Sequence, residues 1–335
     1  MITNSQRALI VATACGLFAA VICPSSALAD TNAGAAGAVL QRVVPSAERS
    51  AAPAYWTPAR MHGAVSARFV DENPDGGNPP SSGSARTDIS TVVRAKQVPT
   101  PKVDPTSPAP GFNAADHLGV VFFRAGGVDQ RCTGNAVVSD SGDLVSTSGR
   151  CVSAVKGEFV RDLVFVPGYD GTAPHGTWAA TVVTAQSDWV FGRSVDDDAA
   201  FFQVQAPSGQ EPATATLSST VGASGVRFTG AEDDDDYQVS GYSTDPGADP
   251  NHPVTVSSTA EPNPWANKDY AIEGLEWDAR AGVSGSPWTS TDADPIADVQ
   301  AGITSFAYKQ FTHASFGPQW TTTIGNLYRT AAAAS

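Results

Sequence analysis

The sequence has few basic residues, few cysteines and few apolar runs long enough to suggest a membrane span. Its 335 residues include 20 Lys and Arg against 34 Asp and Glu, which gives a formal net charge of −14. An acidic surface repels nucleic acid and anionic lipid, so we expect neither as a partner. Apart from one N-terminal stretch, no apolar run approaches the length of a transmembrane helix. The composition favours a soluble protein that binds some other class of molecule.

The N-terminal stretch has the three parts of a secretory signal peptide. Arg7 supplies positive charge, "ALIVATACGLFAAVIC" is apolar but too short to span a bilayer, and Ala27-Leu28-Ala29 forms a cleavage site before Asp30. Cys23 is a poor lipidation site because the large Ile22 precedes it. We therefore predict a signal peptide over residues 1–29 and a secreted, extracellular protein.

Cleavage of the signal peptide would leave only two cysteines, Cys132 and Cys151. Outside the cell these two are expected to form a disulfide, and two buried free thiols are the alternative. Closing a loop of that size stabilises the fold by roughly 3 kcal/mol.

Residues 30–112 are rich in Ala, Pro, Ser and Gly. The stretch "VDENPDGGNPPSSGSAR" has almost nothing to bury, and "PTPKVDPTSPAPGF" is typical of an extended linker. We therefore predict that residues 30–112 form a disordered pro-region or linker. One island within it, "AYWTPARMHGAV", carries Trp56 and Met61, which are candidates for docking elsewhere.

Residues 113–335 show the pattern of a β domain. Short apolar runs such as "GVVFFRA", "DLVFVPGY", "TWAATVVTA" and "AAFFQVQ" alternate with Gly, Pro and Asp. That density of short strands predicts a sandwich or a pair of barrels. Only the end, "TTTIGNLYRTAAAA", indicates a helix.

Three local features suggest chemistry, although each is weak alone. "AGVSGSPW" places Ser284 in a Gly-rich turn, where a hydroxyl and backbone N–H groups can face one point. "DDDAAFF" places Asp198 just before an apolar strand, where an Asp is more often a cap or turn residue. "STSGRC" ends a strand and closes on Cys151.

The order of these features resembles the chymotrypsin-like (trypsin-like) serine peptidases, especially secreted actinobacterial ones, over roughly residues 118–328. The resemblance implies an all-β fold of two packed antiparallel β-barrels with a C-terminal helix. Ser284 matches the nucleophile and Asp198 the acid that orients the general base. Gly282 and Ser284 would supply the N–H groups of the oxyanion hole. "TSFAY" matches the strand that lines the substrate cleft, with Ser305 near the Asp.

Arg150 occupies the position before Cys151 where the family has its catalytic His. A guanidinium stays protonated and has no lone pair to accept the proton of Ser284. We expect it to pair with Asp198 instead and to leave the protein nearly inert as a peptidase. A replacement base would have to come from the other histidines outside the predicted signal peptide, which are His62, His117, His175, His252 and His313.

Three functions follow from this pattern. The first is a catalytically impaired peptidase homologue that retains peptide binding. The second is an active endopeptidase that forms an acyl-enzyme on Ser284 with a substitute base. The third is a structural or surface-interaction protein. In all three we expect a monomer with no cofactor.

Acidic residues near these features have weaker interpretations. Asp278 lies six residues before Ser284, a spacing that in the family places an acid at the base of the specificity pocket, although Arg280 could neutralise it. The runs Glu232–Asp236 and Ser194–Asp198 could offer oxygen ligands to calcium. Solvated loops explain both runs better, so no metal site is predicted.

Overall fold

The computed structural model describes residues 37–67, 70–71, 91–93, 100–109, 111–209, 214–230, 236–262, 272–290, 298–308 and 311–334. The predicted signal peptide, most of the Pro- and Gly-rich stretch after residue 71, and residues 232–235 of one acidic run lie outside these ranges. None of the helices within these ranges has the length and apolar character that a membrane span requires.

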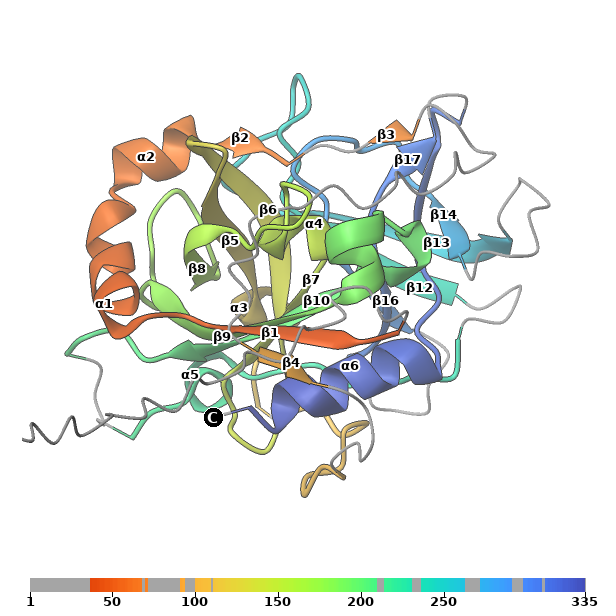
Figure 1. The fold of residues 1–335 in the computed structure, drawn as a ribbon. Helices are drawn as coiled ribbons and strands as arrows, with labels where there is room; N and C mark the ends of the chain where they lie inside the picture. Colours follow the sequence, from red (N-terminus) through yellow and green to blue (C-terminus); the bar gives the residue numbers. More distant parts are fainter. Residues whose placement is uncertain are drawn as a thin grey trace, which may run out of the picture. The chain divides into compact units, whose positions relative to one another are not determined.

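The first sheet contains a closed barrel of six antiparallel strands (Figure 1). Its centre is filled by apolar side chains that are fully buried, such as Phe165, Trp178 and Phe202. The barrel strands are β5 (Leu118–Ala125), β6 (Val128–Val137), β7 (Leu144–Thr147), β8 (Arg161–Pro167), β9 (Trp178–Gln186) and β10 (Ala200–Gln205). The barrel closes through the strand pairs β5–β6, β6–β7, β7–β10, β10–β9, β9–β8 and β8–β5.

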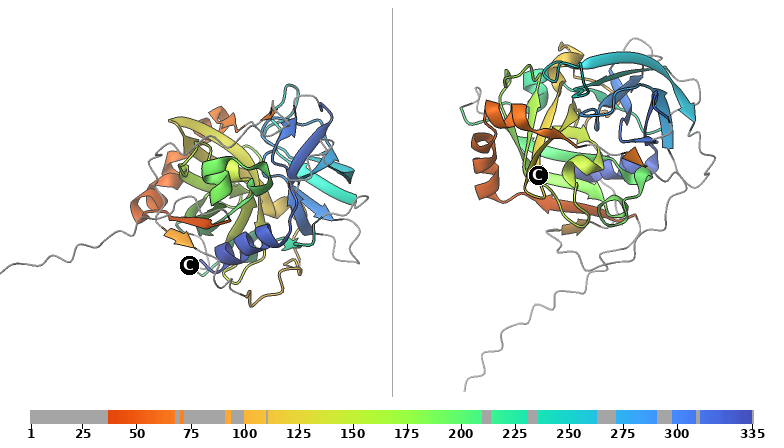
Figure 2. Two further views of the ribbon diagram at one scale, coloured as in Figure 1. Left: turned by 45° about the vertical axis from the view of Figure 1, so that its right-hand side comes forward. Right: turned by 90° about the horizontal axis from the view of Figure 1, so that it is seen from above.

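The second sheet has seven strands and lies beside the first barrel (Figure 2, left). In sheet order the strands are β11 (Gly225–Val226), β16 (Val299–Ile303), β15 (Pro287–Ser290), β12 (Asp236–Gly241), β13 (Val254–Pro262), β14 (Ile272–Glu276) and β18 (Ala314–Pro318). Backbone hydrogen bonds also join Phe306, which follows the second strand in this order, to Phe316 of the last strand. The predicted all-β architecture is therefore confirmed as a closed antiparallel barrel beside a second sheet.

Two smaller predictions are also confirmed. Cys132 on β6 and Cys151 on the short helix α4 (Gly149–Val152) form a disulfide with a Cα–Cα distance of 6.1 Å. The C-terminal segment forms α6 (Thr322–Ala332), which buries Ile324, Leu327 and Tyr328 against β9 and β10. These three residues recur at intervals of three and one along the helix, so they share its buried face.

The predicted disorder of residues 30–112 is wrong for residues 37–67. This stretch forms β1 (Val39–Val43), α1 (Ser46–Tyr55), α2 (Pro58–Gly63) and β2 (Val65–Ser66). Strand β1 pairs with β9 outside the closed barrel, and β2 pairs with β6. Trp56 and Met61, the docking candidates, are only 2% and 3% exposed and pack against Phe122 and Val164 of the barrel. Burial of Trp56 and Met61 against the barrel offsets the conformational entropy that this segment loses on folding. The small and polar residues around them could not do so by themselves.

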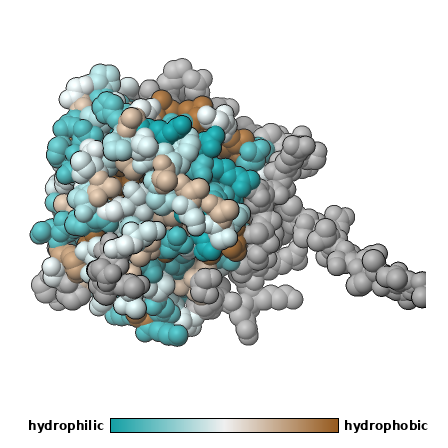
Figure 3. Space-filling view, turned by 90° about the vertical axis from the view of Figure 1, so that its left-hand side faces the viewer, coloured by the Kyte–Doolittle hydropathy of each residue, from teal (hydrophilic) through white to brown (hydrophobic). Residues whose placement is uncertain are grey.

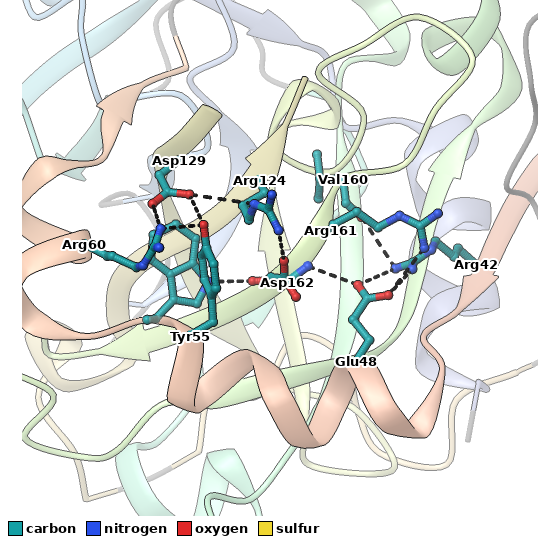
Figure 4. Close-up of polar contacts among 10 residues, drawn as sticks. Arg42, Glu48, Tyr55, Arg60, Arg124, Asp129, Val160, Arg161 and Asp162 are labelled. Carbon is teal, nitrogen blue, oxygen red and sulfur yellow. Dashed lines mark hydrogen bonds and ion pairs between the residues drawn. The ribbon is translucent and has the colours of Figure 1, made fainter. Parts of the chain in front are cut away.

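Charged groups fasten α1 and α2 to the barrel (Figure 4). Glu48 accepts a hydrogen bond of 3.0 Å from the Asp162 N–H and pairs with Arg42. Burial by itself would raise the pKa of Glu48, but Arg42, the Asp162 N–H and Arg161 together lower it. Asp129 of β6 accepts from the Tyr55 hydroxyl at 2.6 Å and from Arg60 at 2.8 Å. The outward face that carries these helices is largely hydrophilic (Figure 3).

Two further short strands come from the predicted pro-region. Strand β3 (Val70–Asp71) runs parallel to β17 (Ala307–Tyr308), which follows β16. Strand β4 (Thr91–Val93) pairs with the outer edge of β1. Parts of the predicted pro-region beyond residue 67 therefore also pair with other strands of the chain.

Candidate active site

The fold brings Arg150, Asp198, Ser284 and Ser305 to one place between the two sheets. Arg150 lies on α4, just after β7, and Asp198 follows the short helix η2 (Val195–Asp197) at the start of β10. Ser284 lies in the loop before β15, and Ser305 follows β16. All four are buried, with Asp198 entirely inaccessible and Ser284 and Arg150 each 4% exposed. Arg150 and Ser305 are 155 positions apart in the sequence, so only the tertiary fold could assemble the site.

Arg150 and Asp198 form a buried ion pair. One carboxylate oxygen of Asp198 accepts the Arg150 backbone N–H at 2.8 Å, and the other accepts from the guanidinium Nε at 3.1 Å and from an Nη. Burial lowers the pKa of Arg150, and the charge of Asp198 acts in the opposite direction. A guanidinium remains protonated under such conditions, so this group donates hydrogen bonds and accepts none.

Ser305 and Trp189 complete the surroundings of the ion pair. The Ser305 hydroxyl donates to the same Asp198 oxygen that binds the guanidinium. Two guanidinium groups make cation–π contacts with the Trp189 ring: the Arg150 Cζ lies 5.4 Å and the Arg193 Cζ 4.8 Å from the ring centroid. Gly149 has no room for a side chain, because a Cβ there would lie 2.6 Å from Trp189 and 2.9 Å from Asp198. Ser305, Trp189 and the close packing at Gly149 therefore restrict the movement of the pair.

The Ser284 hydroxyl meets main-chain oxygens and no imidazole. Its Oγ lies 3.2 Å from the carbonyl oxygen of Ala67 and 3.3 Å from that of Ser305. A carbonyl oxygen is far too weak a base to take the proton of an alcohol. Within the described part of the chain, the hydrogen bonds of the Ser284 hydroxyl therefore go to main-chain oxygens, which cannot act as a general base.

The loop around Ser284 depends on two glycines with positive φ. Gly282 has φ +86°, and a Cβ there would lie 2.2 Å from the Tyr242 carbonyl oxygen. Gly285 has φ +88°, and a Cβ there would lie 2.2 Å from the Thr133 carbonyl oxygen. These two turns hold Ser284 against the first barrel, where its carbonyl accepts the Thr133 N–H at 2.9 Å.

A very small pocket lies beside Ser284, with a volume of about 10 Å³. Arg280 lines it and donates to the carbonyl oxygens of Trp277, Ala279 and Phe311. Asp278, the residue expected at the base of a specificity pocket, is exposed and does not line this pocket. As shaped here, the pocket has no room for a long substrate side chain.

Arg150 is flanked by an acidic turn in which one carboxyl group has an unusual pKa. Burial, followed by the charges of Asp196 and Asp188, raises the pKa of Asp197 to about 7. Arg193 nearby donates to the Ser153 carbonyl at 2.5 Å, and burial lowers its pKa to about 10. No cluster of three or more metal-ligating His, Cys, Asp or Glu side chains occurs among the described residues.

The raised pKa of Asp197 predicts a pH-dependent effect of Asp197→Asn on stability. Between about pH 4 and 7 the folded chain holds a proton that the unfolded chain releases, so ionisation of Asp197 costs stability as the pH rises. The carboxyl is only partly buried, so we expect Asp197→Asn to stabilise the fold by about 1–2 kcal/mol at pH 8 and by almost nothing at pH 4. Urea unfolding at the two pH values measures this, and an equal difference at both would contradict it.

Some residues of the site left no signal in the sequence. Trp189 supports both guanidinium groups, yet nothing in "SDWVFG" distinguishes it from a core residue. Ala67 contacts Ser284 through its backbone carbonyl, which no side-chain pattern can reveal. Of the histidines weighed as replacement bases, His117 is buried against Ser224 and Asp298, and His252 contacts Asp249.

Comparison with known proteins gives matches among solved structures. The chain is similar to the protease Anisep from Arthrobacter nicotinovorans, with 31% identity over 67% of this chain and 99% of that one and a TM-score of 0.60. It is also similar to a thermostable serine protease, AL20, from an extremophilic microorganism, with 26% identity over 66% of this chain and 99% of that one and a TM-score of 0.59. A Glu endopeptidase, at 18% identity and a TM-score of 0.50 over 70% of this chain and 96% of that one, shares the fold. No protein-family model and no curated protein sequence matches the chain.

Proposed function

Because the chain belongs to the chymotrypsin-like serine protease family, we propose that it is a secreted member whose catalytic power is lost and whose peptide-binding cleft is retained. Ser284 corresponds in this proposal to the nucleophile, Asp198 to the orienting acid and Arg150 to a substituted general base. Gly282 and Ser284 would supply the oxyanion-hole N–H groups. The ligand is a protein or peptide segment, and neither a metal nor a cofactor takes part.

The observation that carries this proposal is the ion pair between Arg150 and Asp198. In a working triad the acid holds a neutral imidazole so that its far nitrogen can take the Ser proton. Here the Asp198 carboxylate instead accepts a hydrogen bond of 3.1 Å from the Nε of a permanent cation, Arg150. Loss of the base costs about 10⁶ in turnover in a well-studied serine protease, which leaves a protein that binds better than it cuts.

Labelling of Ser284 tests this proposal against an active enzyme with a substitute base. The purified natural chain should react with an alkyl fluorophosphonate no faster than its Ser284→Ala variant and should not hydrolyse casein. Labelling of Ser284 that Ser284→Ala abolishes, together with hydrolysis, would overturn the proposed loss of catalysis. Saturable binding of an extended peptide, measured by isothermal titration, would support the retained cleft.

A further inference from the structure

We propose that the chain covers its own cleft: residues 64–67, the covering segment, shield Ser284 and must move before any peptide can reach it. The inference rests on the proposed function in taking Ser284 as the centre of the cleft. It adds that the occupant of the cleft is a part of the same molecule.

The first support is the contact at Ser284 itself. The Ala67 carbonyl oxygen lies 3.2 Å from the Ser284 Oγ, and Ser284 is only 4% exposed. A reacting carbonyl carbon must come within about 3–3.5 Å of the attacking oxygen. The space that such a carbon needs is taken by Ala67, which itself is 7% exposed.

Backbone pairing holds the covering segment in place. Val65 and Ser66 pair with Gln130 and Arg131 in a parallel register, and the Ala67 N–H donates to the Arg131 carbonyl at 3.0 Å. This segment therefore uses the edge of β6 as an added strand does in peptide recognition. Shortly after the covering segment, the chain pairs again, because β3 runs parallel to β17.

Side chains and the preceding helices also anchor the covering segment. The Ser66 hydroxyl contacts the hydroxyl of Thr244, which follows β12 of the second sheet. Upstream, the Trp56 indole N–H donates to the Asp162 carbonyl at 2.6 Å, and Arg60 pairs with Asp129. The segment is thus attached to the barrel before it begins and held again along its length.

The geometry at Ser284 does not suit attack on the covering segment. The Ser284 Oγ lies at hydrogen-bond distance from the carbonyl oxygens of Ala67 and Ser305 and can donate its one proton to either, whereas attack would direct an oxygen lone pair toward the Ala67 carbonyl carbon. With Arg150 in place of a base, nothing removes that proton. The segment can therefore stay in the cleft intact.

Thiol labelling of the full chain tests the cover without relying on catalysis. In Ser284→Cys the new thiol should react with iodoacetamide at least about a hundredfold more slowly than in the unfolded chain. Adding Ala67→Pro removes the N–H that bonds Arg131 and should speed labelling by at least about tenfold, whereas Ala67→Gly, which keeps that N–H, should not. Mass spectrometry without reductant verifies that the Cys132–Cys151 bond persists.

Ser286→Cys is the matched control, because Ser286 is fully buried and lies two residues beyond Ser284 in the same loop. Its labelling should stay slow with Ala67→Pro, and a rise in both thiols would reveal general unfolding. In that case the proposal is tested by hydrogen exchange of the natural chain. The Ala67 backbone amide should exchange as slowly as the amides of the barrel strands.

Two results would overturn the proposal. One is rapid labelling of the Ser284→Cys variant while residue 67 is still Ala. The other is an Ala67 amide that exchanges at the unprotected rate in the natural chain. Either result leaves the separate question of catalysis to the fluorophosphonate experiment.

Discussion

The Arg150→His variant should gain peptide hydrolysis by about three orders of magnitude or more over the natural chain. An imidazole at this position would lie beside Asp198, which already accepts the backbone N–H of residue 150 at 2.8 Å. Asp198 would then fix one ring nitrogen as a donor and leave the other free to take the Ser284 proton. Hydrolysis of casein and of a panel of short peptides with small side chains measures the gain.

Two control variants separate the possible causes of such a gain. Ser284→Ala in the Arg150→His background should abolish it. Arg150→Gln removes the charge and most of the bulk of Arg150 but supplies no base, so it should gain almost nothing. An equal gain in Arg150→Gln would mean that the cation blocked the cleft rather than replaced a base. No gain in Arg150→His, even with Ala67→Pro, would favour a structural or surface-interaction role.

The covering segment affects how this gain is read. If residues 64–67 leave the cleft only part of the time, Ser284 would be uncovered in only a small fraction of the Arg150→His molecules. Each of those molecules would hydrolyse peptide rapidly. Titration with a fluorophosphonate counts the open sites, and turnover divided by that count gives the rate of each. Adding Ala67→Pro should then raise the count more than the rate.

The Asp198→Ala variant should destabilise the fold by about 3–5 kcal/mol. It would leave the guanidinium of Arg150 buried beside Trp189 without its carboxylate, and water could not easily replace the partner, because Arg150 is only 4% exposed. The free energy of unfolding in urea measures the loss.

A double-mutant cycle assigns that loss to the ion pair. Arg150→Met removes the charge and retains a flexible apolar side chain, so Arg150→Met with Asp198→Ala should recover most of the stability lost in Asp198→Ala alone. If the double variant is instead as unstable as the sum of the two single variants, the two side chains do not interact energetically. The Ser305 hydroxyl, which also donates to Asp198, would then account for the effect of Asp198→Ala.

The sequence predicted the parts of this protein that depend on local pattern. Short apolar runs between Gly, Pro and Asp indicate most barrel strands, and the stretch "TTTIGNLYRTAAAA" indicates α6. No such run marks strands β13, β14, β15 and β18, because their apolar residues are few and polar residues interrupt them. The pairing of Arg150 with Asp198 was expected from charge and from the matched order of motifs, and the structure places the two in contact.

The covering segment could not be predicted for a different reason. Its stretch of sequence is Ala-rich, and the side chains that anchor it, such as Trp56, are single apolar residues among small ones. Their burial depends on barrel residues more than sixty positions away, such as Phe122 and Asp129. Composition measures what a segment can bury by itself, whereas the side chains that residues 37–67 do bury, such as Trp56 and Met61, are covered by another part of the chain.

Strand β1 connects regions that are almost a whole chain apart, and this has a consequence for folding rate. Its Gln41 side chain contacts Thr184 on β9 and the Thr330 carbonyl on α6, 143 and 289 positions away. Contacts of such separation form late, because the loop entropy must be lost before they stabilise anything. The chain should therefore fold slowly, over milliseconds to seconds or longer. Strand β1 would then pack into the fold only after α6 has been synthesised and has formed.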